Sequence, residues 1–321
     1  MDFYAVDCFF LATVMSVPQR CIGNLTYWPP LYRLIPESSW KRPVPVRDIL
    51  LQMTSYPERT PQWALDFAHF VANQFDARLS SILCHIRTPK VSNWQADKLT
   101  GVSDIIKQNN ARSRQNARKL MEEFSALVDE QRRGDQVLVD CNLAVRPREV
   151  AKRARFYDLT IVPVHVEVEY APIAEATVFE SGRPMLLLPK TDSESEQINS
   201  VAIGWDGSRA AARALADALP FCAMAETVSL LQVTGEKEIG SSGSLSDIQR
   251  HLETHGIKSE ISKVPAEGRD AGSALMDHCS KNEVDMLVIG AFGHSRFREF
   301  LFGGATRSVI DDPHLPVLMS H

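Results

Sequence analysis

The sequence contains few cysteines and no paired cysteine motif. Six cysteines are scattered over 321 residues, with no C-x-x-C pair and no matching Cys/His spacing. A structural zinc site needs four converging ligands, usually from two close pairs, and a disulfide scaffold needs a denser pattern in a shorter chain. The sequence therefore predicts neither. Cys84 and Cys141 lie inside apolar runs, which predicts that both are buried as small hydrophobic side chains.

The chain also lacks an excess of positive charge. Its formal net charge is -5, whereas proteins that bind DNA or RNA through their phosphates need a basic surface. Residues 98–133 carry eight basic and five acidic side chains, which favours a solvated helix face over a nucleic-acid stripe. We therefore expect no nucleic-acid partner.

Several signature motifs of enzymes are absent. The sequence has no G-x4-G-K-[ST], no G-x-G-x-x-G, no G-x-S-x-G and no H-E-x-x-H. These absences argue against a P-loop nucleotidase, a dinucleotide-binding enzyme, an α/β-hydrolase and a zinc protease of the usual types. No general base with a matched acid stands out, so a dedicated enzyme is poorly supported. Slow ATP hydrolysis stays open, because it needs only bound Mg²⁺ and a water.

No apolar run in the N-terminal region is long enough to cross a membrane. The run at 8–17 has ten residues, and Asp2 and Asp7 precede it without any Lys or Arg, unlike a signal peptide. Six prolines follow between residues 18 and 46, which excludes a regular helix. We expect an irregular, proline-rich extension over 1–46, no membrane partner and a cytoplasmic protein.

From Val46 onward, apolar runs typical of buried strands alternate with segments of helical periodicity. The predicted strands are 48–56, 78–86, 137–145, 158–164 and 185–188 in the first half, and 200–205, 227–233, 258–264, 285–290 and 316–319 in the second. The predicted helices are 61–77, 99–133, 147–156 and 175–181, then 208–224, 244–255, 271–282 and one that ends at Asp312. Ser208 is a candidate N-cap, and Gly256 is a helix-stop signal.

Both halves thus follow one order, β-α-β-α-β-α-β-α-β. The first strands of the halves align with an offset of about 152 residues, which indicates one domain of about 140 residues used twice. We predict two α/β domains, 47–190 and 198–321, joined by a polar linker. Strands that alternate with helices form parallel sheets covered on both faces, and such sheets bind ligands at the carboxyl ends of their strands.

Polar and glycine residues follow two strands of the second half. Asp206 follows the strand at 200–205, where an acid could accept hydrogen bonds from a ribose or a base. The alternative is an acid that only stabilises the next helix N-terminus. Gly290 and Gly293 follow the strand at 285–290, and Gly303 lies just before a helix. Backbone N–H groups at a helix start can hold phosphate, although a plain glycine-rich turn remains the alternative.

These glycines read G-x2-G-x9-G, between a strand and a helix in the last third of an α/β domain. With VAIGWDGS at 201–208, LLQV at 230–233, DMLVIGAFGHS at 285–295 and FLFGGATRSVI at 300–310, the segment 198–321 resembles the universal stress protein family. The resemblance implies a five-stranded parallel sheet of the adenine-nucleotide-binding type in each half. It also implies bound ATP, ADP or AMP, with or without Mg²⁺.

The resemblance implies a role for each residue of the motif. Asp206 would lie beside the adenosine, Val233 would pack near the adenine, and Ile289 and Gly290 would line the nucleoside. The phosphates would be held by Gly293, Gly303, Gly304, Ala305 and Thr306.

Two positions depart from the family pattern. Gly304 stands where the family usually has Ser or Thr, which removes a hydroxyl from the phosphate site but keeps the backbone N–H. Trp205 is bulkier than the small residue that usually precedes the acid. It could pack at the strand end or form a wall of the adenine pocket, and the sequence alone leaves both interpretations open.

The first half resembles a degenerate copy of the second. Met53 or Thr54 stands where the second half has Asp206, and the single Gly182 cannot replace three glycines. Acidic residues follow the fourth strand, where a phosphate would need to sit: Glu167, Glu169, Glu175 and Glu180. We therefore expect the first half to keep the fold without binding a nucleotide, as in a tandem universal stress protein.

The sequence thus favours a stress-response protein that senses or stores an adenine nucleotide in its second domain. Its protein partner, whose contacts would change with the bound ligand, is unidentified. Two alternatives remain: an interaction scaffold with a decayed site, and an adenylylating enzyme of the same superfold. The resemblance also implies an intramolecular pseudo-dimer, in which 185–188 pairs with 317–319, and whole chains could form a homodimer.

Overall fold

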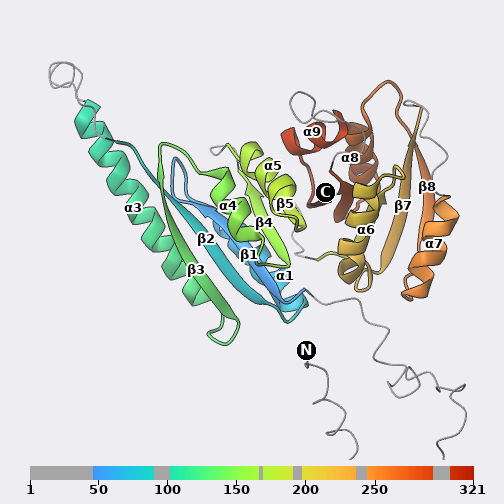
Figure 1. The fold of residues 1–321 in the computed structure, drawn as a ribbon, viewed down its shortest axis with the longest axis horizontal. Helices are drawn as coiled ribbons and strands as arrows, with labels where there is room; N and C mark the ends of the chain where they lie inside the picture. Colours follow the sequence, from blue (N-terminus) through green and yellow to red (C-terminus); the bar gives the residue numbers. More distant parts are fainter. Residues whose placement is uncertain (1–45, 90–101, 166–168, 191–196, 236–243, 292–303) are drawn as a thin grey trace, which may run out of the picture. The chain divides into compact units, whose positions relative to one another are not determined.

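In the computed structural model, the described residues are 46–89, 102–165, 169–190, 197–235, 244–291 and 304–321. They form one mostly parallel sheet with helices on both faces (Figure 1). The predicted extension at 1–46 lies outside these residues except for Val46. None of the described helices combines the length and apolarity that crossing a membrane requires.

The first half contributes five parallel strands and the helices between them. The strands are β1 (Asp48–Thr54), β2 (Arg78–Arg87), β3 (Arg133–Asn142), β4 (Leu159–Val164) and β5 (Met185–Pro189). The helices are α1 (Gln62–Gln74), α3 (Val102–Leu127), α4 (Pro147–Ala154) and α5 (Ala171–Glu180). The strands lie in the order β3-β2-β1-β4-β5.

The second half repeats this arrangement. Its strands are β6 (Ser200–Gly204), β7 (Thr227–Thr234), β8 (Glu260–Pro265), β9 (Met286–Gly290) and β10 (Val317–Ser320), in the order β8-β7-β6-β9-β10. Its helices are α6 (Arg209–Cys222), α7 (Leu245–Thr254), α8 (Ala271–Lys281) and α9 (Gly304–Asp311). The predicted alternation of strands and helices is confirmed in both halves.

The two halves meet at an antiparallel pair of strands. Residues 185–187 of β5 pair with 317–319 of β10, and Leu186 lies opposite Leu318 at the centre. Leu186 and Leu318 hold the same place in their halves, so the pairing is symmetric and joins ten strands into one sheet. The predicted pairing of the two last strands is confirmed within the chain.

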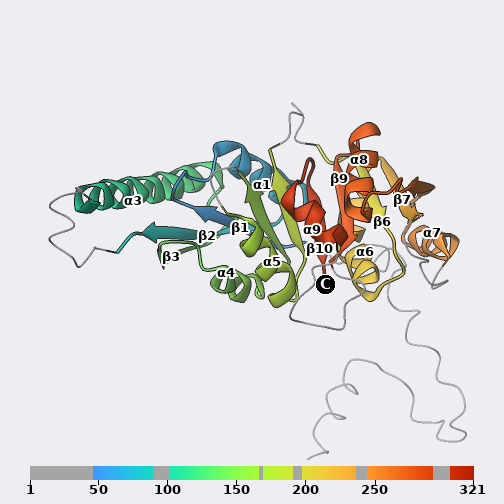
Figure 2. The same ribbon diagram turned by 90° about the horizontal axis from the view of Figure 1, so that it is seen from above.

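The helices cover the two faces of this sheet in equivalent sets. Residues of α1, α3, α6 and α7 pack on one face, and residues of α4, α5, α8 and α9 pack on the other. In Figure 2, α3 lies above β2 and α4 lies below β3, on opposite faces of the sheet. Central strands such as β1 are buried almost throughout, which explains why they are continuous apolar runs.

Several element boundaries differ from the sequence prediction, and the largest difference is that α3 ends at Leu127 rather than at 133. β3 begins at Arg133, four residues before the predicted start at 137. It is an outermost strand, and its first four residues are polar or glycine, so they carry no apolar signal. α5 begins at Ala171 instead of Glu175, because Pro172 occupies the first turn, where its fixed φ favours a helix start.

Candidate functional site

Three of the predicted site residues lie at the carboxyl ends of neighbouring strands. β6 pairs with β7 on one side and β9 on the other, so the strand order reverses between β6 and β9. Asp206 and Val233 each come two residues after the Gly204–Leu231 pair of β6 and β7. Ile289 lies in β9, one residue beyond the Ile203–Val288 pair. The fold therefore brings these residues to the edge where open α/β sheets bind ligands.

Asp206 is held by the turn that begins α6. Its Oδ1 accepts a hydrogen bond from the Ser208 backbone N–H at 2.9 Å, and the Ser208 hydroxyl accepts one from Ala211 N–H at 3.0 Å. Gly207 between them has φ of +75°, a conformation that glycine adopts without strain. The predicted N-cap at Ser208 is confirmed. Asp206 thus supports the helix start, and this contact also fixes its orientation at the strand end.

Two glycines allow close packing around these strand ends. A Cβ on Gly204 would lie 2.9 Å from Leu275 Cδ1 and 3.2 Å from Ile289 Cγ2. A Cβ on Gly290 would lie 2.3 Å from the backbone nitrogen of Ala211. Gly290 is therefore required by the close approach of β9 to α6, a packing reason that the glycine motif alone did not suggest.

Trp205 packs away from the candidate ligand face. Its side chain belongs to the hydrophobic cluster formed with α6 and α7. Val233 and Ile289 belong to the other cluster, on the face that α8 and α9 cover. Of the two interpretations that the sequence left open, the structure therefore favours packing at the strand end over a wall of the adenine pocket.

Helices α8 and α9 begin side by side above this face. A Cβ on Gly272, in the first turn of α8, would lie only 2.1 Å from the carbonyl oxygen of Ala305, in the first turn of α9. Because Gly272 has no side chain, the two helix starts can touch through their backbones. Gly304 is exposed, Ala305 is half-buried and Thr306 is buried. The predicted Gly293 and Gly303 lie outside the described residues.

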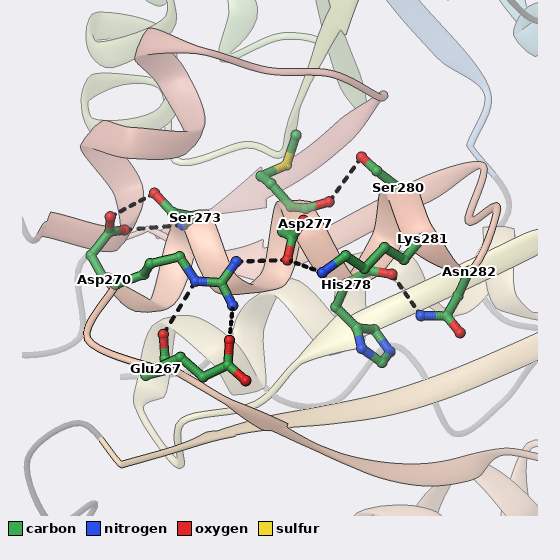
Figure 3. A network of polar contacts seen from close by, with 11 residues as sticks. Glu267, Asp270, Ser273, Asp277, His278, Ser280, Lys281 and Asn282 are labelled. Atoms are coloured by element: carbon green, nitrogen blue, oxygen red, sulfur yellow. Dashed lines mark hydrogen bonds and ion pairs between the residues drawn. The ribbon is translucent and has the colours of Figure 1, made fainter.

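Asp270 is a site residue that the motif did not identify. As the N-cap of α8 it accepts hydrogen bonds from the Ser273 backbone N–H at 3.1 Å and from the Ser273 hydroxyl at 2.6 Å (Figure 3). A Cβ on Gly304 would lie 3.8 Å from the Cβ of Asp270. Burial opposes ionisation, but hydrogen bonds from Ser273 and Ser308 outweigh it and hold the pKa of Asp270 below its usual value.

A polar network continues from Asp270 along the surface of α8. Arg269 donates to Asp277 at 2.6 Å and lies 3.3 Å from Glu267, and Lys281 donates to Asp277 at 2.9 Å (Figure 3). These side chains are largely exposed, so each ion pair contributes at most about 1 kcal/mol to stability. The network orders the outer surface of α8 and adds no group to the strand ends. An Asp directly before an apolar periodic run is the sequence signal that could have identified Asp270 as a cap.

The first half has different side chains at the equivalent positions. The strand registers align Asp48 with Ser200, so Gln52 corresponds to Gly204 and Thr54 to Asp206. Pro163 likewise corresponds to Gly290. Gln52 is buried, 3% exposed, and its Nε2 has no hydrogen-bond partner among the residues that the structure describes. A large side chain therefore lies in the first half where the second half has only the hydrogen of a glycine.

The predicted position of Glu175 needs a correction. Glu175 lies one turn inside α5, not at the start of that helix where a phosphate would be held. Burial and the nearby charge of Asp311 raise its pKa, and Arg307 opposes that rise. Glu175 therefore faces α9 at the contact between the halves. Tyr170 reinforces this contact, because its hydroxyl donates to the Asp311 carbonyl oxygen at 3.1 Å.

The described residues contain no cluster of three or more His, Cys, Asp or Glu side chains that could hold a metal ion. Carboxylate and phosphate oxygens together are the usual ligands of Mg²⁺.

Comparisons with solved structures support the fold of the chain. A universal stress protein from Archaeoglobus fulgidus DSM 4304 aligns with 85% of this chain and 97% of its own, with a TM-score of 0.58 and 12% identity. At this identity the likeness concerns the fold alone. Another universal stress protein, crystallised in complex with cAMP, is 19% identical over 38% of this chain and 95% of its own, with a TM-score of 0.29.

Comparisons of sequence identify the family. Universal stress protein Slr1230 from Synechocystis sp. is 25% identical over 138 residues, which are 42% of this chain and 46% of that protein. The chain thus matches less than half of that relative's length. The model of the universal stress protein family matches residues 197–321, the segment that carries the glycine spacing and Asp206. Residues 197–321 are therefore a domain of the universal stress protein family.

Proposed function

We propose that residues 198–321 bind an adenine nucleotide, ATP or AMP, and that the protein acts in the cytoplasm as a nucleotide-dependent sensor or regulator of a stress response. One observation carries this proposal. Asp206, Val233 and Ile289 lie at the carboxyl ends of three neighbouring strands, where the strand order reverses. The membership of this segment in the universal stress protein family supports the same conclusion.

The groups at this edge suit the parts of a nucleotide. Val233 and Ile289 offer apolar surface for a base, and Asp206 offers a carboxylate that can accept hydrogen bonds from ribose hydroxyls. The backbone N–H groups at the start of α9, at Gly304, Ala305 and Thr306, belong to a helix N-terminus, which suits phosphate oxygens. Gly204 lets Leu275 and Ile289 pack against the backbone of β6, whereas the polar Gln52 side chain fills this position in the first half.

The differences between equivalent residues of the two halves support different roles for two domains, 47–190 and 198–321. Gln52 and Thr54 replace Gly204 and Asp206, and no glycine begins α5. The first domain then contributes the fold and the β5–β10 contact, and the second contributes the binding chemistry.

One feature favours the alternative of an interaction scaffold. The carboxylate of Asp270, ionised at neutral pH, lies beside Gly304, where it would repel the phosphates of a nucleotide. Mg²⁺ would relieve this repulsion by binding an oxygen of the Asp270 carboxylate and an oxygen of the phosphates. Nucleotide binding by this protein should therefore require the metal. If the protein binds no nucleotide in the presence of Mg²⁺, the scaffold function is supported instead.

The test is to purify the full chain without added ligand, denature it and analyse the supernatant by chromatography for adenine nucleotides. Thermal unfolding is then followed with added ATP or AMP, each with and without Mg²⁺. A ligand at a hundredfold excess over its dissociation constant stabilises the folded state by about 2.7 kcal/mol. If no nucleotide is released and no ligand raises the melting temperature, the proposal is contradicted.

Matched variants locate the site. Asp206→Asn keeps an oxygen that can accept the Ser208 N–H but removes the charge, and Gly303→Val blocks the approach of a phosphate to the backbone. Both should reduce ligand-dependent stabilisation. Asp66→Asn, a change of the same charge on α1 of the first half, is the control and should leave it unchanged.

A further inference from the structure

The first half contains two cysteines on neighbouring strands. Cys84 lies in β2 and Cys141 in β3, and these strands run parallel with Cys84 beside Val139 and Ile86 beside Cys141. The two cysteines are therefore diagonal neighbours. Both side chains belong to the hydrophobic cluster on the face covered by α4 and α5, and both are buried. Their thiols point to the same side of the sheet.

The two thiols lie near each other and near the start of α4. Each thiol changes the pKa of the other, and the Arg146 backbone N–H favours the thiolate form of both. Arg146 is the N-cap residue of α4, and its exposed side chain adds a positive charge nearby. In its neutral form, the Cys141 thiol also donates a hydrogen bond to the Val139 carbonyl oxygen at 3.7 Å.

These contacts distinguish Cys141 from the other described cysteines. The hydrogen bond from Cys84, together with the Arg146 N–H and side chain, lowers the pKa of Cys141 to about 7, although burial and Asp140 oppose this. The same hydrogen bond and burial raise the pKa of Cys84. Burial alone raises the pKa of Cys222 and of Cys279 to about 12. A thiolate at a helix start beside a cation is the usual setting of a reactive cysteine.

At the positions that correspond to the two thiols, the second half has apolar residues instead of cysteines. By strand register, Cys84 corresponds to Val233 and Cys141 to Ala266. Gln52, with its buried and unpartnered Nε2, lies on the adjacent strand β1 and on the same face. It offers an N–H donor on the face that holds the thiols. The half that lacks the nucleotide residues therefore has a dithiol in the corresponding part of its sheet.

We propose that Cys84 and Cys141 form an oxidation site for hydroperoxides, in which Cys141 reacts first and Cys84 closes a disulfide with it. The Cys141 thiolate attacks one oxygen of the peroxide and breaks the O–O bond, which leaves a sulfenic acid on Cys141 and releases water or an alcohol. The Cys84 thiol then attacks this sulfur, forms the S–S bond and expels water. The two cysteines lose two electrons, and the two oxygens of the peroxide gain them.

The position of β3 makes this closure feasible. β3 is an outermost strand and pairs with β2 alone. Diagonal positions in parallel strands lie farther apart than a relaxed disulfide requires, so the end of β3 must move toward β2. The residues after Cys141, from Asn142 to Ala144, are exposed and free of a second strand neighbour. The bond would tie the start of α4 to β2 and change the surface around Leu143, an exposed apolar residue with a φ of +69°.

The test treats the folded, fully reduced chain with hydrogen peroxide at pH 7, quenches it at intervals and maps each cysteine by mass spectrometry. We expect a peptide pair linked through Cys84 and Cys141, restored to free thiols by a reductant. Cys222 and Cys279 are internal controls, because they are equally buried but have no thiol neighbour in the described structure. They should react at least about tenfold more slowly. Equal rates for all four thiols would overturn the proposal.

Two variants separate the steps. Cys84→Ser should stop the reaction at the sulfenic acid of Cys141, trapped by a 1,3-dione, and Cys141→Ser should leave Cys84 unmodified. If Cys141 proceeds to a sulfinic acid without any link to Cys84 in the unaltered chain, Cys84 is not the resolving thiol and the proposal is wrong. The rate of alkylation of Cys141 in the unaltered chain provides a measurement independent of the variants. It should rise with a midpoint near neutral pH, and a midpoint as high as that of Cys222 contradicts the proposal.

Discussion

Gln52 and Gly204 occupy the same position in the two halves of the sheet. Each is the fifth residue of its strand, and they face Ile82 in β2 and Leu231 in β7, respectively. Gln52 is buried with an unpartnered amide nitrogen, whereas a Cβ on Gly204 would already meet Leu275 and Ile289. At this position a polar side chain therefore fills the strand end of the first half, whereas apolar side chains pack directly against the backbone in the second half.

The first prediction follows from this pair. Gly204→Gln should abolish the rise in melting temperature that MgATP causes, because the new side chain must occupy the apolar surface between Leu275 and Ile289. Crowding a packed face also destabilises the fold by about 1–3 kcal/mol. Thermal unfolding with and without the ligand measures both effects in one experiment.

The matched control for this prediction is Gln52→Gly in the first half. It removes a buried, unpartnered amide and should leave the response to MgATP unchanged. A Gly204→Gln protein that still responds to MgATP as the unaltered protein does would show that the nucleotide binds elsewhere.

The sequence predicted the elements well because their signals are local. Apolar runs identified the buried strands, and Ser208 before an Ala-rich segment identified the start of α6. The roles of Gly272 and Asp270 were missed, because their partners Ala305 and Gly304 lie more than 30 residues away in the chain. Likewise, nothing local relates Cys84 to Cys141. Their contact depends on the register of two parallel strands, which the sequence pattern does not specify.

The second prediction concerns the contact between α8 and α9. Gly272→Ala places a methyl group 2.1 Å from the carbonyl oxygen of Ala305, a backbone atom that cannot turn aside. The two helix starts must separate, so we expect a loss of about 1–3 kcal/mol in the free energy of unfolding. Chemical denaturation measures this loss.

Gly304→Ala is the control for that contact. Its methyl group would lie 3.8 Å from Asp270 Cβ, an ordinary van der Waals distance, and alanine favours a helix over glycine by up to about 1 kcal/mol. The variant should be as stable as the unaltered protein or slightly more stable. Equal destabilisation by both substitutions would argue against the close approach of α8 to α9.

The third prediction is a pH dependence at the contact between the halves. Burial and the charge of Asp311 raise the pKa of Glu175 in the folded protein. A carboxyl group with a raised folded-state pKa favours folding when it is protonated. Its contribution to stability is therefore complete below the unfolded pKa, near 4.3, and is lost as the pH rises through the folded pKa.

Glu175→Gln removes this titration. The variant should be more stable than the unaltered protein at pH 7, by less than about 1 kcal/mol because the side chain is partly exposed to solvent. The difference should shrink as the pH falls through the folded pKa and vanish below the unfolded pKa. Urea denaturation across this pH range measures it, and a Glu175→Gln protein that is less stable at pH 7 would show that the attraction of Glu175 to the charge of Arg307 outweighs burial and the repulsion from Asp311.

The fourth prediction concerns an aromatic contact that joins the halves. Phe75, at the end of α1, and Phe221, in α6, meet edge to face with ring centroids 4.8 Å apart and an interplanar angle of 84°. Phe221 is among the largest fully buried side chains. Phe221→Ala should therefore lower the free energy of unfolding by about 3–5 kcal/mol. Phe156→Ala removes the same ring from a site that is 76% exposed and should change the free energy of unfolding by less than about 0.5 kcal/mol.

If the halves unfolded independently, Phe221→Ala would shift only one of two transitions. Because both halves share one sheet and this aromatic pair, we expect a single transition, followed by circular dichroism, that moves as a whole to lower denaturant.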